Sequence, residues 1–329
     1  MQLRRIKRGA DLYLELRMPQ GWIAVAKCLA GLSFQHSGEA SLLAVDVLTA
    51  MQAPTELRTA IEDAARNIEP EKTSDTEVVI PFAPRSFRDF MLYEAHAVAA
   101  ARGFVRTFMP RAAGVVRTYE ALTRRTFPRL KPHSLWYRQP LYYMGNHLTF
   151  ATAGEDIAIP SYARALDYEL ELGFVLAHPL LDATPLEAER AIGGFVALND
   201  LSVRDVQLAE MASGFGPQKA KHFRSAMSNV VVTADEILPR WKSLKGSVRL
   251  NGKLVAETSI AGARWSLGEV LAHASRGEAL QAGELFGTGT LPGGSGIENG
   301  RLLAPGDVVE LGIDGVGTLT KRIVAGGQA

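Results

Sequence analysis

The sequence predicts an α+β protein, mostly β, with a smaller N-terminal domain over residues 1–75 and a larger C-terminal domain over residues 76–329. Three observations lead to this expectation. Beyond residue 76 the chain is dense in short β-branched and apolar runs, which are typical of strands. In residues 38–65 the apolar side chains instead recur with the spacing of an α-helix. The polar run Glu69–Asp75 lies between the two patterns, and its proline and dense charge favour an exposed connection.

The N-terminal part is predicted to combine strands with helix. Leu3–Leu16 contains strand-like stretches, and Gly38–Ala65 is expected to be largely helical. The first 70 residues contain no clear catalytic constellation. The apolar residues that carry the helical pattern are Leu42, Leu43, Val47, Leu48, Leu57, Ile61 and Ala65.

In the C-terminal part strands are expected to dominate, with few and short helices. Asn251-Gly252 separates two strand-like runs and is a strong signal for a hairpin turn. Thr184-Pro185 predicts the start of a short helix that extends to Ile192, because proline suits the first helical position. The predicted strands are Val78–Ile80, Leu170–Leu176, Gly194–Leu198, Val230–Val232, Ser247–Leu250, Val308–Ile313 and Gly317–Ile323.

Composition excludes several classes of partner. The 36 basic and 35 acidic residues leave a net charge of +1, and no basic run suggests nucleic acid or an anionic membrane as partner. Cys28 is the single cysteine, so an intrachain disulfide is impossible, which fits a reducing compartment. The apolar stretch Trp22–Leu32 is interrupted by Lys27 and is too short to span a bilayer. We therefore expect a cytoplasmic protein with no signal peptide and no membrane segment.

The most informative segment is Leu166–Leu176, with the sequence LDYELELGFVL. Successive strand side chains point to opposite faces, so Asp167, Glu169 and Glu171 share one face. Crowded carboxylates are best tolerated in water or around a hard cation such as Mg²⁺ or Ca²⁺. By itself, the pattern also fits a solvated strand face whose acids pair with lysines of a neighbouring strand.

A second segment, Phe195–Gln207, ends an apolar strand at Asn199-Asp200. Asp200 at a strand end could be held rigidly and still reach a cavity. Ser202 is expected to cap a helix on which Arg204 and Gln207 share one face. The alternative is an ordinary helix start followed by surface charges.

A third segment, Phe87–Gly103, contains Asp89 and His96 seven residues apart, and the two fall on one face if the segment is helical. Histidine is the side chain best suited to move protons near neutral pH. The competing interpretation is a surface or packing histidine on an alanine-rich helix.

Two further segments suit anionic ligands. Lys219 and Lys221 follow the Gly216-Pro217 turn and could neutralise acidic substrate groups, although loop lysines are usually only solvated. Leu285–Asn299 is expected to be a glycine-rich loop whose backbone N–H groups can approach an anion. It lacks the Gly-Lys-Ser/Thr ending of a phosphate-binding loop, which excludes that kind of nucleotide site.

Taken in order, these segments resemble the fumarylacetoacetate hydrolase (fumarylacetoacetase) superfamily over about residues 78–324. The most specific pieces are DYELELGFV, NDLSVRDVQ, Gly-Pro followed by Lys221, and GTGTLPGG. The resemblance implies a fumarylacetoacetase-like catalytic domain built on a mixed, rolled β-sheet. It also implies a homodimer formed through that domain.

The resemblance further implies a divalent metal site for Mg²⁺, Ca²⁺ or Mn²⁺. Oxygen-only ligation favours these ions over zinc. Lys221 and Arg204 match the family's cations and would offset the negative charge. The metal ligands carried over onto this chain are Asp89, Glu169, Glu171 and Asp200.

The implied activity is hydrolysis of a carbon–carbon bond in a β-diketo acid of the fumarylacetoacetate or acylpyruvate type. The metal would polarise the carbonyl and stabilise the developing enolate, and His96 would activate the attacking water. Glu298 matches the acidic partner that orients this histidine. The residues expected to hold the substrate are Tyr143, Arg204, Gln207, Lys221 and Thr288.

This chain departs from the family pattern in two places that bear on the substrate. Met91 stands where fumarylacetoacetases carry tyrosine, and the segment Trp136–His147 differs from the standard one. A 2-oxoacid decarboxylase, tautomerase or hydratase using the same site is therefore an alternative, as is a non-catalytic, metal-stabilised binding protein. His96 favours hydrolysis, and the intact set of carboxylates argues against the binding protein.

Overall fold

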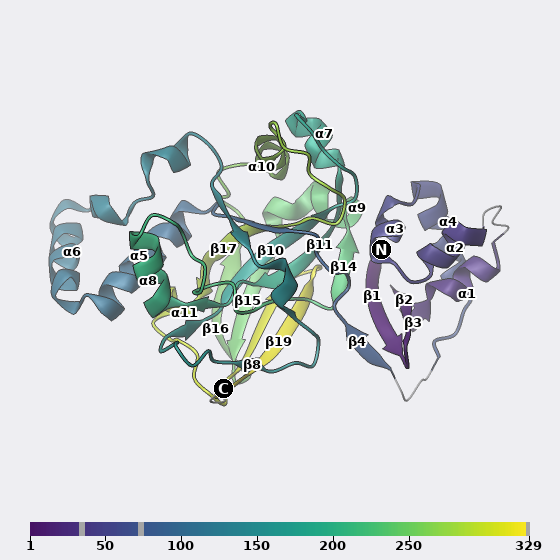
Figure 1. The fold of residues 1–329 in the computed structure, drawn as a ribbon, viewed down its shortest axis with the longest axis horizontal. Helices are drawn as coiled ribbons and strands as arrows, with labels where there is room; N and C mark the ends of the chain where they lie inside the picture. The colour runs from purple at the N-terminus through teal and green to yellow at the C-terminus, as the bar shows by residue number, and fades with distance from the viewer. Residues whose placement is uncertain (33–36, 72–75, 327–329) are drawn as a thin grey trace.

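The structure, a computed structural model, describes residues 1–32, 37–71 and 76–326. Strands fill the centre of the molecule and helices lie around them (Figure 1). The main sheet has twelve strands, and its longest path runs β3-β2-β1-β14-β11-β10-β17-β5-β6. Both parallel and antiparallel pairs occur, for example β17–β5 and β10–β11. The expected strand-rich α+β fold with a mixed sheet is confirmed.

Within the described residues of the N-terminal part, an antiparallel three-strand ladder has four short helices packed beside it (Figure 1). The helical stretch expected over Gly38–Ala65 is broken into separate helices, because Asp46 caps the start of α3 by accepting from Thr49 N at 2.8 Å, and Pro54 precedes α4. The elements are β1 (Gln2–Arg8), β2 (Asp11–Met18), β3 (Gly21–Ala24), α1 (Val25–Ala30), α2 (Ser37–Leu43), α3 (Val47–Gln52) and α4 (Thr55–Ala65).

The main sheet continues across the predicted domain boundary. β1 pairs with β14 (Val230–Thr233) on one side and with β4 (Glu77–Val79) further along. Residues 72–75 of the expected connection lie outside the described part of the chain. The division into residues 1–75 and 76–329 therefore stays a proposal, because the sheet itself does not divide there.

The remaining strands lie C-terminal to β4. A second sheet, β16-β15-β18-β19-β8, has five strands, and β9 pairs with β12. The strands are β5 (Phe87–Phe90), β6 (Tyr142–Gly145), β7 (Phe150–Ala151), β8 (Ile157–Ala158), β9 (Leu166–Asp167), β10 (Glu169–Leu176), β11 (Ile192–Asn199), β12 (Ser202–Val203), β13 (Ser225–Met227), β15 (Lys245–Leu250), β16 (Lys253–Ser259), β17 (Leu285–Ser295), β18 (Val308–Ile313) and β19 (Gly317–Val324).

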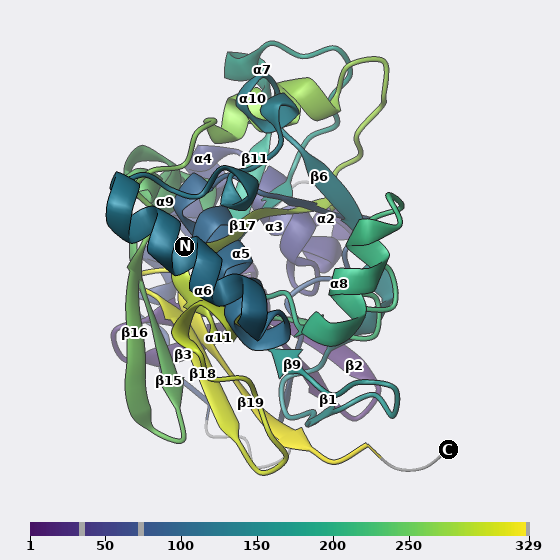
Figure 2. The same cartoon turned by 90° about the vertical axis from the view of Figure 1, so that its left-hand side faces the viewer.

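The expectation of few and short helices beyond residue 76 was wrong. α5 (Glu94–Phe108) and α6 (Pro110–Thr123) are the longest helices of the described residues. Alanine-rich sequence with high helix propensity builds α5, and Pro110 at the first position restarts the helix as α6. α5, α6, α8 and α11 gather at the end of the molecule opposite the N-terminal helices (Figure 1). Figure 2 views the molecule from that end, with α6 in front.

The other helices are short. Thr184 caps α7 as expected, but α7 ends at Arg190 because Ile192 already belongs to β11. The remaining helices are α7 (Pro185–Arg190), α8 (Arg204–Ala212), α9 (Ala234–Ile237), α10 (Leu267–Ala274) and α11 (Gly296–Asn299), with 3₁₀ turns at Pro128–Leu130, Ser134–Tyr137, His147–Thr149 and Leu238–Ser243.

Two turn predictions had different outcomes. Asn251 and Gly252 have φ values of 52° and 77° and join β15 to β16, which confirms the hairpin. Leu285–Asn299, expected as a glycine-rich loop, is mostly the strand β17, which lies between β10 and β5. Hydrogen bonding to β10 on one side and β5 on the other holds the glycines of β17 in a strand despite their flexibility.

The central strands bring the conspicuous acids to one end of the sheet. All residues of β10 and β11 are buried. The two strands are antiparallel, with Leu170 opposite Asn199, so the start of β10 adjoins the end of β11. β17 places Gly287 opposite Asp89 of β5 on its other side. Segments more than 100 residues apart in sequence therefore meet here.

Candidate metal centre and active site

Three buried carboxylates form a cluster at this end of the sheet. Asp89 comes from β5, Glu171 from β10, and Asp200 from the residue after β11. One oxygen of each lies within 4.8 Å of an oxygen of the others. The side chains are at most 5% exposed, so water does not screen their mutual repulsion.

The cluster fits a hard divalent cation. Asp89 Oδ1, Glu171 Oε2 and Asp200 Oδ1 are buried and accept no hydrogen bond within the protein. Buried oxygens without a partner are costly, and a carboxylate set of this kind is what Mg²⁺, Ca²⁺ and Mn²⁺ bind. Three unpartnered oxygens that converge from three strands are therefore candidate ligands for one ion.

The electrostatics of the cluster favour a bound positive charge. Burial raises the pKa of Asp89 well above its usual range, and the charges of Glu171 and Asp200 raise it further. Burial and the neighbouring Asp200 likewise raise the pKa of Glu171. Without a cation, the cluster therefore tends to retain protons.

Gly287 of β17 leaves the space into which two of these carboxylates extend. A Cβ at this position would lie closer to Asp89 Oδ1 and Glu171 Oε2 than real Cβ atoms approach oxygen, at 2.7 Å from the Glu171 oxygen. The glycine is required here because of this close approach, since a side chain would displace the carboxylates from each other.

We expect Gly287→Ala to weaken metal binding by about 10- to 100-fold, the range typical when groups that orient ligands are disturbed. Isothermal titration with Mn²⁺ measures this directly. Gly114→Ala in α6 is the matched control, because a Cβ there meets nothing within 4 Å. Equal Mn²⁺ affinity in both variants would contradict the role given to Gly287.

Glu169, which was also expected to be a metal ligand, has different contacts from the three clustered acids. Arg204 Nη2 contacts Glu169 Oε1 at 2.7 Å, and Lys221 Nζ pairs with Glu169 Oε2 and with Asp200 Oδ2. Burial opposes ionisation of Glu169, but the charges of Arg204 and Lys221 outweigh it and hold its pKa well below the usual range. Glu169 is thus the ionised acid between the two cations, and Lys221 joins it to Asp200 of the cluster.

Ser202 does not cap the helix that follows, contrary to expectation. It lies in β12, and its hydroxyl donates to Glu169 Oε2 at 3.2 Å. α8 begins at Arg204 with no side-chain cap. The buried pairing of β12 with β9 draws this serine into the site instead.

His96 and Glu298 meet, as the sequence predicted. His96 Nδ1 lies 3.0 Å from Glu298 Oε2, outside the alignment of a hydrogen bond, and His96 Nε2 lies 3.9 Å from Glu169 Oε1. The carboxylate of Glu298 also accepts from Ser295 Oγ at 2.8 Å. The idea that Asp89 and His96 share a helix face was wrong, since Asp89 lies in β5 and only His96 in α5.

Of the expected substrate-binding residues, Tyr143 and Lys221 contact the cluster through Asp200, whereas Arg204 and Gln207 lie beyond Glu169. Tyr143 Oη donates to Asp200 Oδ2 at 2.7 Å, and Arg204 Nη1 donates to Gln207 Oε1 at 2.8 Å. Thr288 is tied to backbone, because its hydroxyl donates to Gly289 O and accepts from Leu172 N. Tyr143 and Gln207 are partly exposed, whereas Arg204, Lys221 and Thr288 are buried.

Two residues of this region were not among the predicted site residues, although the sequence analysis placed Asp167 on the acidic strand face. Thr290 Oγ1 donates to Glu171 Oε1 at 3.3 Å. Asp167 contacts Arg204 and the start of α11. The alternation of Asp167 with Glu169 and Glu171 was the available sequence signal for Asp167. Alternation predicts the strand face on which a side chain lies, but it does not predict which residues that side chain contacts.

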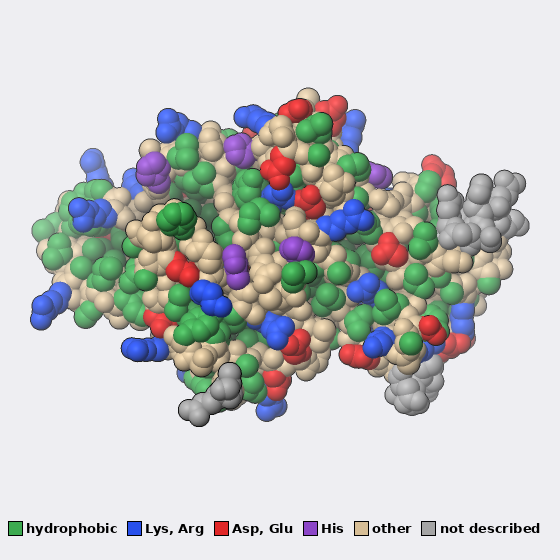
Figure 3. All heavy atoms as spheres, viewed as in Figure 1, with side chains coloured by type: hydrophobic (Ala, Val, Ile, Leu, Met, Phe, Trp, Pro, Cys, Tyr) green, Lys and Arg blue, Asp and Glu red, His purple; other side chains and the backbone are tan. Residues whose placement is uncertain are grey.

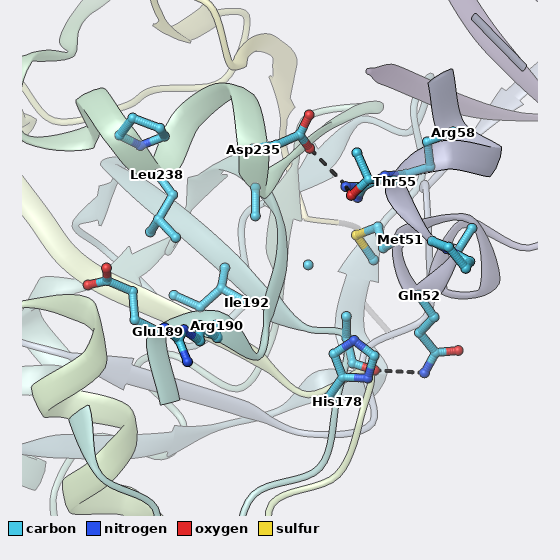
Figure 4. A pocket seen from close by; sticks show the side chains of 16 residues that line it. Met51, Gln52, Thr55, Arg58, His178, Glu189, Arg190, Ile192, Asp235 and Leu238 are labelled. Carbon is cyan, nitrogen blue, oxygen red and sulfur yellow. Dashed lines mark hydrogen bonds and ion pairs between the residues drawn. The ribbon is translucent and has the colours of Figure 1, made fainter. Parts of the chain in front are cut away.

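A separate cleft of about 530 Å³ lies between the N-terminal helices and the body of the protein (Figure 4). Met51, Arg58, His178 and Asp235 are among its lining residues. Ile192 at the start of β11 also lines it, whereas Asp200 follows the other end of that strand. The cleft and the acid cluster are therefore distinct places.

The face of the molecule shown in Figure 3 has no dominant charge. Figure 3 shows basic and acidic side chains interspersed over the face it displays, in keeping with the net charge of +1. Among the described residues, no helix is long and apolar enough to cross a membrane.

The chain is similar to known proteins in sequence. Residues 112–324 match the family model described as fumarylacetoacetate (FAA) hydrolase C-terminal. Human mitochondrial oxaloacetate tautomerase FAHD1 is 26% identical over 185 residues, covering 56% of this chain and 81% of that protein. Oxaloacetate tautomerase YisK of Bacillus subtilis (strain 168) is 31% identical over 159 residues, covering 48% and 52%.

Solved structures share the fold across the chain. Fumarylacetoacetate hydrolase from Exiguobacterium antarcticum superposes with a TM-score of 0.68 at 19% identity, covering 99% of both chains. Maleylpyruvate hydrolase from Sphingobium sp. SYK-6, in complex with manganese (II) ion and pyruvate, gives 0.67 at 17% identity, covering 99% of this chain and all of that one. Asp89 and His96 precede the segment that the family model matches.

Proposed function

This chain belongs to the fumarylacetoacetate hydrolase family, and we propose that it is a divalent-metal-dependent enzyme that cleaves a carbon–carbon bond of a small β-diketo acid by hydrolysis. Asp89, Glu171 and Asp200 would hold the metal, with Glu169 completing the acidic set. The support is the converging, unpartnered oxygens of Asp89, Glu171 and Asp200, together with the manganese ion named for the maleylpyruvate hydrolase structure.

A bound divalent cation would supply Lewis-acid polarisation of a substrate carbonyl. Around it, Lys221 and Arg204 bring positive charge that suits an acidic substrate, and both are at most 5% exposed. Burial opposes the protonated form of Lys221, but Asp200 and Glu169 raise its pKa above the usual value, so it remains an ammonium group. Gln207 adds an amide that can donate to a substrate oxygen.

The observation that carries hydrolysis is the His96–Glu298 pair, with Nδ1 and Oε2 3.0 Å apart. A carboxylate beside Nδ1 favours the proton on that nitrogen and leaves Nε2 to accept one from water. The water oxygen then bonds to the carbonyl carbon, and the adjacent carbon–carbon bond breaks. Its electron pair stays with the oxo acid fragment (pyruvate in the case of an acylpyruvate), which takes up a proton.

Tautomerisation of a 2-oxo acid such as oxaloacetate is the second candidate. The curated relatives FAHD1 and YisK are named oxaloacetate tautomerases. That reaction moves one proton between carbon and oxygen, so the same acidic site and a single base suffice. Decarboxylation and hydration have no comparable support.

One panel of substrates separates the two reactions. Purified protein with Mg²⁺ or Mn²⁺ is given fumarylacetoacetate, an acylpyruvate and oxaloacetate, while the loss of ultraviolet enol absorbance is followed. In ¹⁸O-labelled water, hydrolysis yields a cleaved carboxylic acid that carries the label in its new carboxyl group, whereas tautomerisation breaks no carbon–carbon bond and yields no such acid. Enol loss for oxaloacetate alone, without any cleaved product, would replace the first proposal by the second.

Metal binding is expected to strengthen as pH rises. The raised pKa values of Asp89 and Glu171 mean that the folded protein binds more protons than the unfolded chain from about their ordinary values of 3.8 and 4.5 upwards. Without metal, these groups therefore make stability fall as pH rises through that window, and metal binding there displaces protons. Titration with Mn²⁺ in buffers of different ionisation enthalpy measures the released protons.

Other ionisable groups add their own pH dependence, so the test compares wild type with Glu171→Gln at each pH. The wild type should release more protons on binding Mn²⁺. Metal binding that releases no protons anywhere between pH 5 and 7 would show that the cluster is already ionised, contrary to the direction of these shifts.

Magnesium as the physiological metal, assembly into a homodimer and a cytoplasmic location are retained as parts of this proposal. The comparisons support a divalent metal and a small-molecule substrate. Sedimentation at micromolar concentration tests the dimer, and a monomer mass would count against it.

A further inference from the structure

Asp167 is the most completely buried acid near the site, and the proposed reaction does not use it. Its side chain is 0% exposed, and it lies in β9, two residues before Glu169. It is not part of the acid cluster of Asp89, Glu171 and Asp200. A fully buried charge is retained only where its partners compensate for the loss of water.

One side of Asp167 holds the start of α11. Asp167 Oδ1 accepts from Gly296 N at 2.8 Å, and Oδ2 accepts from Ile297 N at 2.9 Å. These amides open a four-residue helix, which is too short to be stable by itself. Glu298, the next residue, is the carboxylate beside His96.

The other side of Asp167 reaches the acids and cations of the site. Arg204 Nε donates to Asp167 Oδ2 at 2.8 Å, and Arg204 Nη2 bridges Asp167 and Glu169 at 2.7 Å each. A continuous line of buried ion pairs thus runs from α11 through Arg204 and Glu169 to Lys221 and Asp200. Asp167 is where this line meets α11.

We propose that Asp167 is a positioning residue for the His96–Glu298 pair. By binding the amides of Gly296 and Ile297, it fixes α11 in place, so that Glu298 lies against His96 Nδ1 while Nε2 lies on the side of Glu169. The catalytic consequence rests on the proposed function, but the positioning itself does not.

Packing supports a close fit at this point. A Cβ on Gly296 would overlap Asp167 Oδ1 and the carbonyl oxygen of Arg301, so α11 lies directly on the carboxylate. α5 also packs on α11: Gly103 faces Ile297 without room for a Cβ, and Arg106 Nη2 donates to Ile297 O at 2.9 Å. The helix that carries His96 and the turn that carries Glu298 are therefore held in contact, with Asp167 beneath the turn.

Asp167→Asn tests the proposal, because the amide retains the shape but replaces one acceptor by a donor. We expect kcat to fall by about 10- to 100-fold, as for other groups that orient a catalytic shell. KM and the Kd for Mn²⁺ should change by less than about threefold. Gly296→Ala keeps every charge and ion pair and disturbs the same contact, so it should give the same pattern if Asp167→Asn does not fold.

Asp307→Asn is the matched control. Asp307 is 6% exposed, binds Arg301 at 3.0 Å, and accepts from Ala304 N at 2.9 Å, yet it does not touch the amides of α11. It therefore reports the general effect of removing a buried, arginine-paired aspartate. Its kcat should remain close to that of the wild type.

A second readout does not depend on the reaction. In protein with ¹⁵N-labelled histidine, the ring signals of His96, assigned with His96→Gln, should show the proton mainly on Nδ1 in the wild type. Asp167→Asn and Gly296→Ala should move His96 toward a mixture of tautomers, and Asp307→Asn should not. If no substrate is turned over but this shift occurs, the positioning role stands and the proposed function fails.

Three results would overturn the positioning role. Unchanged His96 signals in both Asp167→Asn and Gly296→Ala would show that α11 does not need the contact. A loss of kcat matched by an equal loss of Mn²⁺ affinity would make Asp167 a support for Glu169 instead. If Asp307→Asn lost as much kcat as Asp167→Asn, the role of Asp167 would be purely structural.

Discussion

Glu171→Gln should abolish metal-dependent turnover. The change removes one charge from the acid cluster and replaces an unpartnered carboxylate oxygen, Glu171 Oε2, by an amide group that binds a dication poorly. A metal present at 100 times its Kd stabilises the folded wild type by about 2.7 kcal/mol, and a 100-fold weaker site leaves about 0.4 kcal/mol at the same concentration. Thermal unfolding with and without Mn²⁺ measures the difference.

Glu284→Gln is the control for this variant. Glu284 is also buried and paired, with Arg88 and Ser86, but it lies outside the acid cluster. The Glu284→Gln variant should be less stable than the wild type without metal, but Mn²⁺ should stabilise it by the same free energy as the wild type. If Glu171→Gln retained that increment too, the three converging carboxylates would not be the metal site.

Glu169→Gln is expected to behave differently from Glu171→Gln. Both oxygens of Glu169 already have partners, Arg204 and Lys221, whereas one oxygen of Glu171 has none. Removing the charge of Glu169 leaves buried cations undercompensated, which costs stability even without metal. The metal-free unfolding temperature should therefore drop further for Glu169→Gln.

His96→Ala should lower turnover by about 10² to 10⁴, the usual range for general acid–base catalysis. His96 is not among the three clustered carboxylates, so the Mn²⁺ affinity should change little. Glu298→Gln should cause a smaller loss of the same kind, because an amide beside Nδ1 still orients the ring but no longer favours the protonated nitrogen. Steady-state kinetics with an acylpyruvate, together with Mn²⁺ titration, separate these effects.

His273→Ala serves as the control, because this histidine lies on α10, away from the acid cluster. It should retain wild-type kinetics. Full hydrolytic turnover by folded His96→Ala would remove His96 as the base. The same variant tested on oxaloacetate decides whether tautomerisation depends on this residue.

Much of the site could be predicted from the sequence because local pattern carries chemistry. The alternation in Leu166–Leu176 singled out Glu169 and Glu171 without any knowledge of the fold, although Asp167, expected on the same strand, lies in the separate strand β9. Asn251-Gly252 and Thr184-Pro185 specify their turn and helix start through backbone sterics that act within a few residues. The order of the motifs then identified the family, which the match over residues 112–324 confirmed.

Tertiary structure alone decided which acids meet. Glu169 and Glu171 are equivalent in the sequence pattern, yet the antiparallel pairing of β10 with β11 and β17 gives Glu171 to the cluster and Glu169 to Arg204 and Lys221. Likewise, the pairing of β12 with β9 made Ser202 a partner of Glu169 rather than a helix cap. Side-chain periodicity determines the face on which a residue lies, but only long-range strand pairing determines its neighbours, and a buried charge takes its role from those neighbours.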